Sequence, residues 1–427
     1  LGPPHRRLEL GSGDAGSDDA GSGATEHILA ALPTRPGVLV FERGDAPEPA
    51  QRTVAVVATA DLRAAAERRL TTDGPKADLS GVTDRVLAWV CGSAFEADAV
   101  WLELARQRLP TTYSAALERW KVWFLRLDPD ADEPVWSATD PLDTDDSVRK
   151  DLDPSVLIGP FAAREHARSF GRLLDDVFEL CREPKLLAQR PGATACAYKQ
   201  MGVCPAACDG SEPMSAYRAR VRGALELVRT GPASVRTSIE QQMRDASSDM
   251  EFERAATLRS RLDRLARLDK PAWRRATTLD RFAVLAVRPA GRRGWARLIA
   301  HAGGRTAWVA DVRADADDLA SVEPALARAL DPGSGVDLSR GGAERLSLCA
   351  RALLRPGRGA GAILPLVRSV NEPGVGGLTD TDRAAIRSAV RAAAKIDRDD
   401  ADGKASGEPS GEPSGGAGEL SCEGETR

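Results

Sequence analysis

Four cysteines lie close together in the sequence, and this is the group of side chains best suited to chemistry. They are Cys181, Cys196, Cys204 and Cys208, and the last three are spaced C-x7-C-x3-C. Four thiolates suit either a tetrahedral zinc ion or an iron–sulfur cluster. The group contains no C-x2-C pair, which disfavours a zinc ribbon. Four independent buried thiols are the alternative, but four of the seven cysteines fall within 28 residues.

The elements next to these cysteines are predicted to be helical. Apolar residues in Phe161–Cys181 recur at helical spacing, and Tyr217–Arg229 has the same pattern, so the cysteines lie in a loop between two helices. A helical hairpin follows, with arms Val235–Ala246 and Phe252–Leu268 and a turn at Ser247–Asp249.

The regions on either side of this middle part mix strands and helices. Alternating apolar runs and amphipathic stretches predict a small α/β unit before the cysteines, and a β-hairpin with helices after them. The strands are Gly37–Phe41, Thr53–Ala58, Lys121–Leu127, Phe282–Val287, Trp295–Ala300 and Thr306–Val312. The helices are Asp61–Leu70, Phe95–Arg108, Leu319–Leu330, Glu344–Leu354 and Thr381–Lys395. The predicted fold class is α+β.

Composition divides the chain into seven segments. Gly, Ser, Asp and Pro dominate both ends and one internal stretch, which predicts disorder or a linker there. The segments are a disordered leader (1–24), a small α/β domain (25–127), an acidic linker (128–154), a helix with the four cysteines (155–230), a helical hairpin (231–270), a β-hairpin and helical region (271–396) and a disordered acidic tail (397–427).

The net charge of −4 conceals an uneven distribution. Between Cys181 and Arg305 there are 24 Lys and Arg against 12 Asp and Glu. A basic middle with acidic ends is typical of a surface that faces phosphates. Candidate phosphate contacts, each of which could equally be solvated surface, are Arg274, Arg275, Arg292 and Arg293.

Several protein classes are excluded by composition. No run of 18 apolar residues could span a bilayer, so no membrane association is expected. The first 24 residues contain no apolar core of a signal peptide. Seven cysteines in 427 residues are too few for a secreted disulfide scaffold.

Four motifs together resemble the UvrC/Cho family of excinucleases. Leu32–Val38 is similar to the opening of the family's GIY-YIG nuclease domain, and Ile158–Phe161 resembles its F-G-P-[YF] segment. The Cys196–Cys208 spacing matches the UvrC cysteine motif, while the longer gap from Cys181 resembles Cho. Met250–Arg259 is similar to the UVR motif, through which UvrC and UvrB associate.

The resemblance implies cofactors and partners. It implies a cytoplasmic protein of nucleotide excision repair and the SOS response that binds DNA and either UvrB or a UvrB-like helicase. It also implies a 4Fe-4S cluster on the four cysteines, with zinc as the alternative. Partner contacts would come from Phe252, Glu253, Ala256 and Arg259. Phe252 could instead fold back onto Met243 and Ala256.

The nuclease residues of the family are the main departure. A GIY-YIG site uses two tyrosines, an arginine and a glutamate that holds a divalent metal. Those positions fall at Leu39, Ala55, Ala65 and Trp101, so no Mg²⁺ or Mn²⁺ site is expected. Asp98 is the nearest acidic substitute, since Glu103 and Arg63 each lie about 200° around their helices from the lost positions.

Three functions remain open from the sequence. The first is a UvrC-like repair protein with a degenerate GIY-YIG domain. It is also expected to lack the RNase H-like nuclease, because the roughly 125 ordered residues after Leu268 are too few for it. The second is an active Cho/UvrC-type endonuclease with a rearranged site. The third is a metal-binding UVR regulatory protein outside repair.

Overall fold

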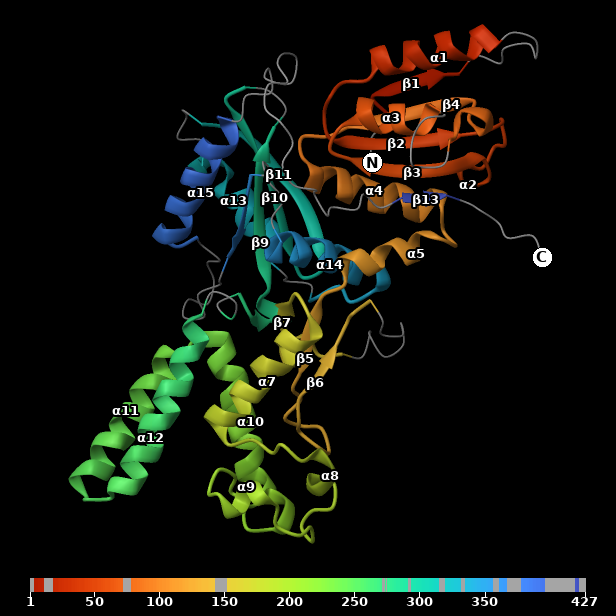
Figure 1. The fold of residues 1–427 in the computed structure, drawn as a ribbon. Helices are drawn as coiled ribbons and strands as arrows, with labels where there is room; N and C mark the ends of the chain where they lie inside the picture. Colours follow the sequence, from red (N-terminus) through yellow and green to blue (C-terminus); the bar gives the residue numbers. More distant parts are fainter. Residues whose placement is uncertain are drawn as a thin grey trace, which may run out of the picture.

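Three antiparallel sheets with helices packed on their faces form the fold (Figure 1). The computed structural model describes residues 4–10, 18–71, 78–142, 152–270, 273, 275–290, 293–314, 319–331, 335–355, 361–366, 378–395 and 419–421. Helices and antiparallel strands alternate within these ranges, which confirms the α+β class. No helix in the described part is long and apolar enough to cross a membrane.

The first sheet has the strand order β1-β4-β2-β3-β13. Its strands are β1 (Arg6–Glu9), β2 (Gly37–Glu42), β3 (Thr53–Thr59), β4 (Arg85–Val90) and β13 (Glu419–Ser421). Its helices are α1 (Asp18–Ala31), α2 (Pro49–Arg52), α3 (Leu62–Leu70) and α4 (Ala94–Arg108). Successive side chains of a strand point to opposite faces, so Leu39 packs with α1 and α3 while Val38 and Val40 pack with α4.

Both ends of the chain contribute strands to this sheet, which corrects two predictions. In the predicted disordered leader, β1 pairs with β4 and α1 begins at Asp18. In the predicted disordered tail, β13 pairs with the outer side of β3. Residues 1–3, 11–17, 397–418 and 422–427 lie outside the described residues.

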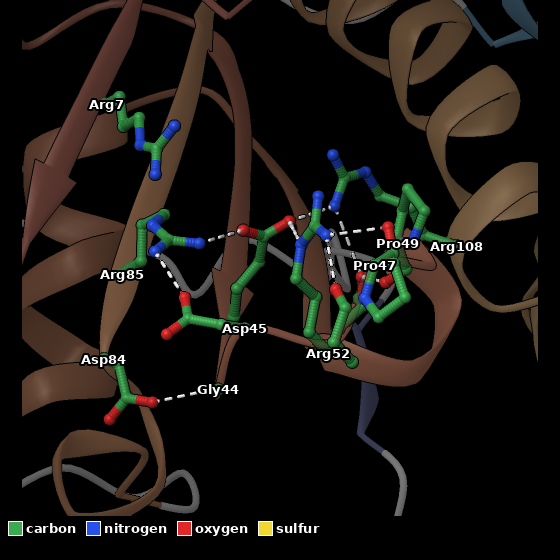
Figure 2. A network of polar contacts seen from close by, with 12 residues as sticks. Arg7, Gly44, Asp45, Pro47, Pro49, Arg52, Asp84, Arg85 and Arg108 are labelled. Atoms are coloured by element: carbon green, nitrogen blue, oxygen red, sulfur yellow. Dashed lines mark hydrogen bonds and ion pairs between the residues drawn. The ribbon is translucent and has the colours of Figure 1, made fainter.

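Arg52, Arg85 and Arg108 belong to a network of polar contacts in this domain (Figure 2), and all three pair with Glu42. The Glu42 carboxylate is 1% exposed, 3.1 Å from Arg52 and 3.4 Å from Arg85, and it also accepts a hydrogen bond from Arg108. Burial alone would raise the pKa of Glu42, but the hydrogen bonds from Arg108 and Arg52 hold it below its usual value. The network joins β2 and β4 to the end of α4, so these cations serve the fold.

The second sheet has the order β6-β5-β7-β8. Its strands are β5 (Trp123–Arg126), β6 (Ser137–Thr139), β7 (Leu157–Phe161) and β8 (Thr277–Thr278). The helices of this region are α5 (Tyr113–Ala116), which precedes the sheet, α7 (Arg164–Phe178), α8 (Pro184–Leu187), α9 (Ala197–Gln200) and α10 (Met214–Thr230). Strand β6 lies within 128–154, the segment predicted to be an acidic linker.

The third sheet has the order β11-β10-β9-β12. Its strands are β9 (Ala283–Pro289), β10 (Trp295–Ala302), β11 (Arg305–Arg313) and β12 (Ala362–Pro365), and its helices are α13 (Leu319–Leu330), α14 (Arg340–Leu354) and α15 (Asp380–Ala394). One face packs on α13 and α15. The other face shares a single core with α4 and α14, and Arg106 of α4 contacts the buried Glu344 of α14 at 2.5 Å.

Candidate partner-binding hairpin and cysteine site

The helical hairpin consists of α11 (Ala233–Ser248) and α12 (Phe252–Leu265), and it extends away from the three sheets (Figure 1). The two arms pack along their length through side chains that recur every three or four residues. The buried members are Ile239, Ala246, Leu258 and Leu265. At its base the hairpin contacts α7, where Arg261 and Arg264 donate to the backbone carbonyls of Val177 and Asp176.

The tip of the hairpin has the backbone of a Schellman cap. The Glu251 amide donates to the Ala246 carbonyl at 2.8 Å, and the Met250 amide donates to the Ser247 carbonyl at 3.2 Å. Met250 itself has φ 60°. That left-handed position is usually occupied by glycine, because a side chain there costs about 1–2 kcal/mol. Helix α11 runs through Ser248, so the turn lies about two residues later than the sequence predicts.

Two large apolar side chains are exposed at this tip. Met250 is 75% exposed and Phe252 is 68% exposed. Phe252 therefore does not fold back onto Met243, which was the alternative interpretation. The other three predicted contacts, Glu253, Ala256 and Arg259, are also exposed and follow Phe252 along the outer side of α12.

Met250 is a tip residue that the sequence analysis missed. The sequence does contain a hint of its role. Gly or Asn is usual just after the end of a helix, and Met occupies that position here. An apolar side chain that is exposed to solvent on a strained backbone does not stabilise the folded monomer. Its position fits a surface that becomes buried in a complex.

The four cysteines come from three separate pieces of backbone. Cys181 follows α7, Cys196 caps the N-terminus of α9, and Cys204 and Cys208 lie on the return toward α10. The loop is closed by the Ala193 amide, which donates to the Cys208 carbonyl at 3.2 Å.

The four thiols influence one another electrostatically. Burial, together with the charges of the three other thiols, raises the pKa of Cys181 to about 11. Burial and the neighbouring thiols also raise the pKa of Cys204, against a backbone hydrogen bond from Ala206 that lowers it. Within the described ranges, however, no three His, Cys, Asp or Glu side chains stand at metal-ligand spacing. The donor chemistry fits a soft metal or cluster, but the sulfurs do not form a closed ligand set here.

The four positions to which the sequence resemblance assigns the nuclease residues are all buried in apolar cores. Leu39, Ala55 and Ala65 lie in the core beneath α1 and α3, and each is at most 2% exposed. Trp101 is fully buried on the other face of the sheet, where its indole donates to the Val56 carbonyl at 3.0 Å. The four positions are therefore not brought together at one surface.

The neighbouring polar residues are engaged in other contacts. Asp98 lies 3.8 Å from Arg119, whose guanidinium stacks on the Trp101 ring. Tyr113 donates its hydroxyl to the buried Glu344 at 3.0 Å. Glu103 pairs with Arg106. Each of these groups serves packing between α4, the segment after it and α14.

The predicted phosphate contacts differ in their exposure and in their hydrogen bonds. Arg275 donates to the Leu353 carbonyl at 2.8 Å, which fixes it against the body. Arg293 is exposed in the β9–β10 turn. Arg274 and Arg292 lie outside the described residues. Many other arginines of the basic middle are paired, and α10 contributes two of them, Arg218 and Arg222, to Asp130.

Two adjacent regions of the chain match known protein families. Residues 136–227 match the family described as UvrC/Cho excinuclease, middle domain, and residues 234–268 match the UvrB/uvrC motif. No solved structure matches the chain significantly.

Proteins with similar sequences are named UvrABC system protein C. The protein from Syntrophotalea carbinolica is 33% identical over 138 residues, which is 32% of this chain and 21% of the relative. The protein from Desulforudis audaxviator is 31% identical over 112 residues, or 26% of this chain and 18% of the relative. The match thus spans about a fifth of these relatives' length. Two adjacent regions of the chain are therefore similar to the UvrC/Cho excinuclease middle domain and to the UvrB/uvrC motif that follows it.

Proposed function

We propose that this protein acts in nucleotide excision repair by binding UvrB, or a UvrB-like helicase, through the tip of the α11–α12 hairpin. The observation that carries the proposal is the exposed pair Met250 and Phe252 on a hairpin that matches the UvrB/uvrC motif. Burial of such apolar anchors supplies most of the affinity in many interfaces. The protein would also bind DNA, and its role would be that of an adaptor or a competitor of the incision step.

The same proposal includes loss of cleavage by the N-terminal domain. Its support is the burial of Leu39, Ala55, Ala65 and Trp101, since a hydrolytic site needs polar groups that reach substrate and metal. We expect no nicking of lesion-bearing duplex by the full chain with Mg²⁺ or Mn²⁺ and cognate UvrB. An active UvrC protein assayed alongside serves as the positive control. Nicking that disappears in Asp98→Ala would contradict the proposal and favour a rearranged active site.

The proposal assigns an iron–sulfur cluster to Cys181, Cys196, Cys204 and Cys208. Its support is the mutual electrostatic effect of the thiols and the soft chemistry of four sulfur donors. A bound cation would reverse the raised thiol pKa values, because it stabilises the thiolate. The cluster would hold the loop between α7 and α10 in one conformation.

Anaerobic purification should therefore give a brown protein with broad visible absorbance. We expect Cys204→Ser to lose most of that absorbance and the bound iron, because one of four ligands is removed. Cys349→Ser is the matched control, since Cys349 is buried under the third sheet, distant from the cluster in the chain. A colourless wild-type protein with stoichiometric zinc would show that the cluster assignment is wrong.

A further inference from the structure

A pocket of about 220 Å³ lies where the base of the α11–α12 hairpin meets the third sheet. Its walls come from the end of α10, the segment that leads into α11, the residues around β8, the start of β9 and the end of β12. In Figure 1 the base of the hairpin lies next to the start of β9, at this junction. Pockets for drug-sized ligands measure about 300–1,000 Å³, so this one has the size for a single ring system.

The interior of the pocket is mainly aromatic and aliphatic. Phe170, Trp273 and Phe282 contribute the aromatic rings. The Trp273 ring is held in place by other rings, with its centroid 5.4 Å from that of Phe170 and 6.2 Å from that of Phe161. Apolar walls that face an unfilled space lack the contacts that a packed neighbour would supply. A planar aromatic ligand would supply them by stacking.

The charged groups in the lining are all cationic. Arg229, Arg275 and Arg281 line the pocket, and none of the described lining residues is acidic. Asp280 lies outside the lining and pairs with Arg229 at 2.6 Å, which offsets one charge. Arg275 donates to a backbone carbonyl, which carries no net charge, so its positive charge remains. The pocket therefore combines an apolar interior with a preference for anions.

Two of these arginines are oriented by contacts that do not use all their donors. Arg229 donates to Asp280, and Arg275 donates to the Leu353 carbonyl at 2.8 Å. A guanidinium has five N–H donors, so each of these two side chains is fixed in direction and can still donate to a ligand. Phosphate oxygens are strong acceptors for such donors. Arg275 is also one of the phosphate contacts that the sequence predicts.

We propose that this pocket binds one nucleotide, with the base against Trp273 and Phe282 and the phosphate toward Arg229 and Arg275. The combination carries the assignment, because an aromatic interior selects a ring and the neighbouring guanidinium groups select an anion. Two sources share this chemistry, an unpaired nucleotide within a DNA strand and a free nucleotide. The inference deepens the proposed DNA binding, and it rests on that function for the first source.

The first experiment measures binding of the full chain to two labelled duplexes by fluorescence anisotropy. One duplex is fully paired, and the other contains a single unpaired nucleotide. We expect the wild-type chain to bind the second duplex about tenfold more tightly, a ratio within the range for stacking one base on aromatic side chains. The ratio of the two affinities reports on the pocket, because contacts with the paired backbone are common to both duplexes.

Two substitutions fill the pocket from opposite walls. Ala276→Leu enlarges a residue next to β8, and Val228→Phe enlarges one at the end of α10. Each should lower the ratio of affinities to about one and leave the affinity for the paired duplex unchanged. Ala384→Leu, at an exposed position on α15, is the control and should keep the wild-type ratio. A tenfold ratio that persists in both filled variants, shown to be folded by urea denaturation, would overturn the proposal.

A competition experiment on the wild-type chain separates the two sources. Deoxyadenosine monophosphate is added to the complex with the unpaired duplex, and deoxyadenosine, which lacks the phosphate, is the control. Displacement by the monophosphate and much less by the nucleoside supports the pocket and shows that a free nucleotide is enough. A tenfold ratio that resists the monophosphate but is lost in the filled variants supports a nucleotide within a strand. Equal displacement by the two compounds would overturn the assignment of the phosphate to the arginines.

Failure of the proposed function can be told apart from failure of this inference. If the wild-type chain binds neither duplex, calorimetry with deoxyadenosine monophosphate tests the pocket alone. Binding that is lost in Ala276→Leu supports the pocket, and no binding overturns it. UvrB affinity is measured on the same variant and should be unchanged, because the hairpin tip is a separate surface. Failure of the wild-type chain to bind UvrB concerns the tip only.

Discussion

Replacing Phe252 with alanine is expected to weaken binding to cognate UvrB by about 30-fold or more, which corresponds to about 2 kcal/mol. The reason is that an exposed phenyl ring at the hairpin tip has apolar area to bury only in a complex. Because the ring is 68% exposed in the monomer, the free energy of unfolding should change by no more than about 0.5 kcal/mol. Isothermal titration calorimetry and urea denaturation measure the two quantities.

Met250→Gly should separate binding from stability even more clearly. Glycine relieves the left-handed strain at φ 60°, so the hairpin should become more stable by up to about 1 kcal/mol. The same change removes an apolar contact and should weaken UvrB binding. A stabilised variant with reduced affinity is the expected result. Increased UvrB affinity would show that Met250 is not part of the interface.

A control for the hairpin variants is Trp308→Ala. Trp308 is 52% exposed on β11, so its removal also deletes exposed aromatic surface, but from the third sheet. UvrB affinity should stay at the wild-type value. If Trp308→Ala weakens binding as much as Phe252→Ala does, the interface is not located at the hairpin tip.

Trp101→Ala is expected to reduce the free energy of unfolding by about 3–5 kcal/mol. The indole is fully buried, packs edge-on against Trp120 with ring centroids 5.4 Å apart, and donates to the Val56 carbonyl. Its removal leaves a cavity and deletes the hydrogen bond from the indole to the Val56 carbonyl. The loss is large against the usual total of about 5–15 kcal/mol. Urea denaturation followed by circular dichroism measures it.

Trp101→Glu places a carboxylate where the sequence resemblance predicts the metal-binding glutamate. A carboxylate there would be buried without a partner, so we expect this variant to be less stable than Trp101→Ala and to gain no cleavage activity. Glu118→Gln, at an exposed position, is the control and should stay within about 0.5 kcal/mol of the wild type. A stable Trp101→Glu protein that nicks DNA would show that position 101 opens to an active site.

The parts of the fold that the sequence predicts well are those with one buried face. Helix α7 and both arms of the hairpin show apolar residues at helical spacing, and the structure confirms them within a few residues. Strand β4 was missed because it lies inside the sheet and is apolar on both faces, so Arg85–Val90 shows no alternation. Strand β1 was missed because the leader's composition resembles disorder, and only pairing with β4 orders it.

The candidate site residues also differ in how far the sequence alone predicts their surroundings. The predicted partner contacts Phe252, Glu253, Ala256 and Arg259 follow from a local motif, and the structure leaves all four exposed. Burial of the four predicted nuclease positions on opposite faces of the first sheet depends on register, which the sequence does not specify alone.

The shared core of the first and third sheets has a consequence for synthesis of the chain. That core joins residues from Val38 to Leu353, whereas the core of the second sheet and hairpin closes by Leu268, with Trp273 and Ala276 packed at its margin. As the chain leaves the ribosome, the residues of the second core are synthesised before α14, whereas the face of the first sheet that packs with α4 needs α14 to complete its core. The core of the first sheet is therefore completed late, although its strands β1 to β4 are made first.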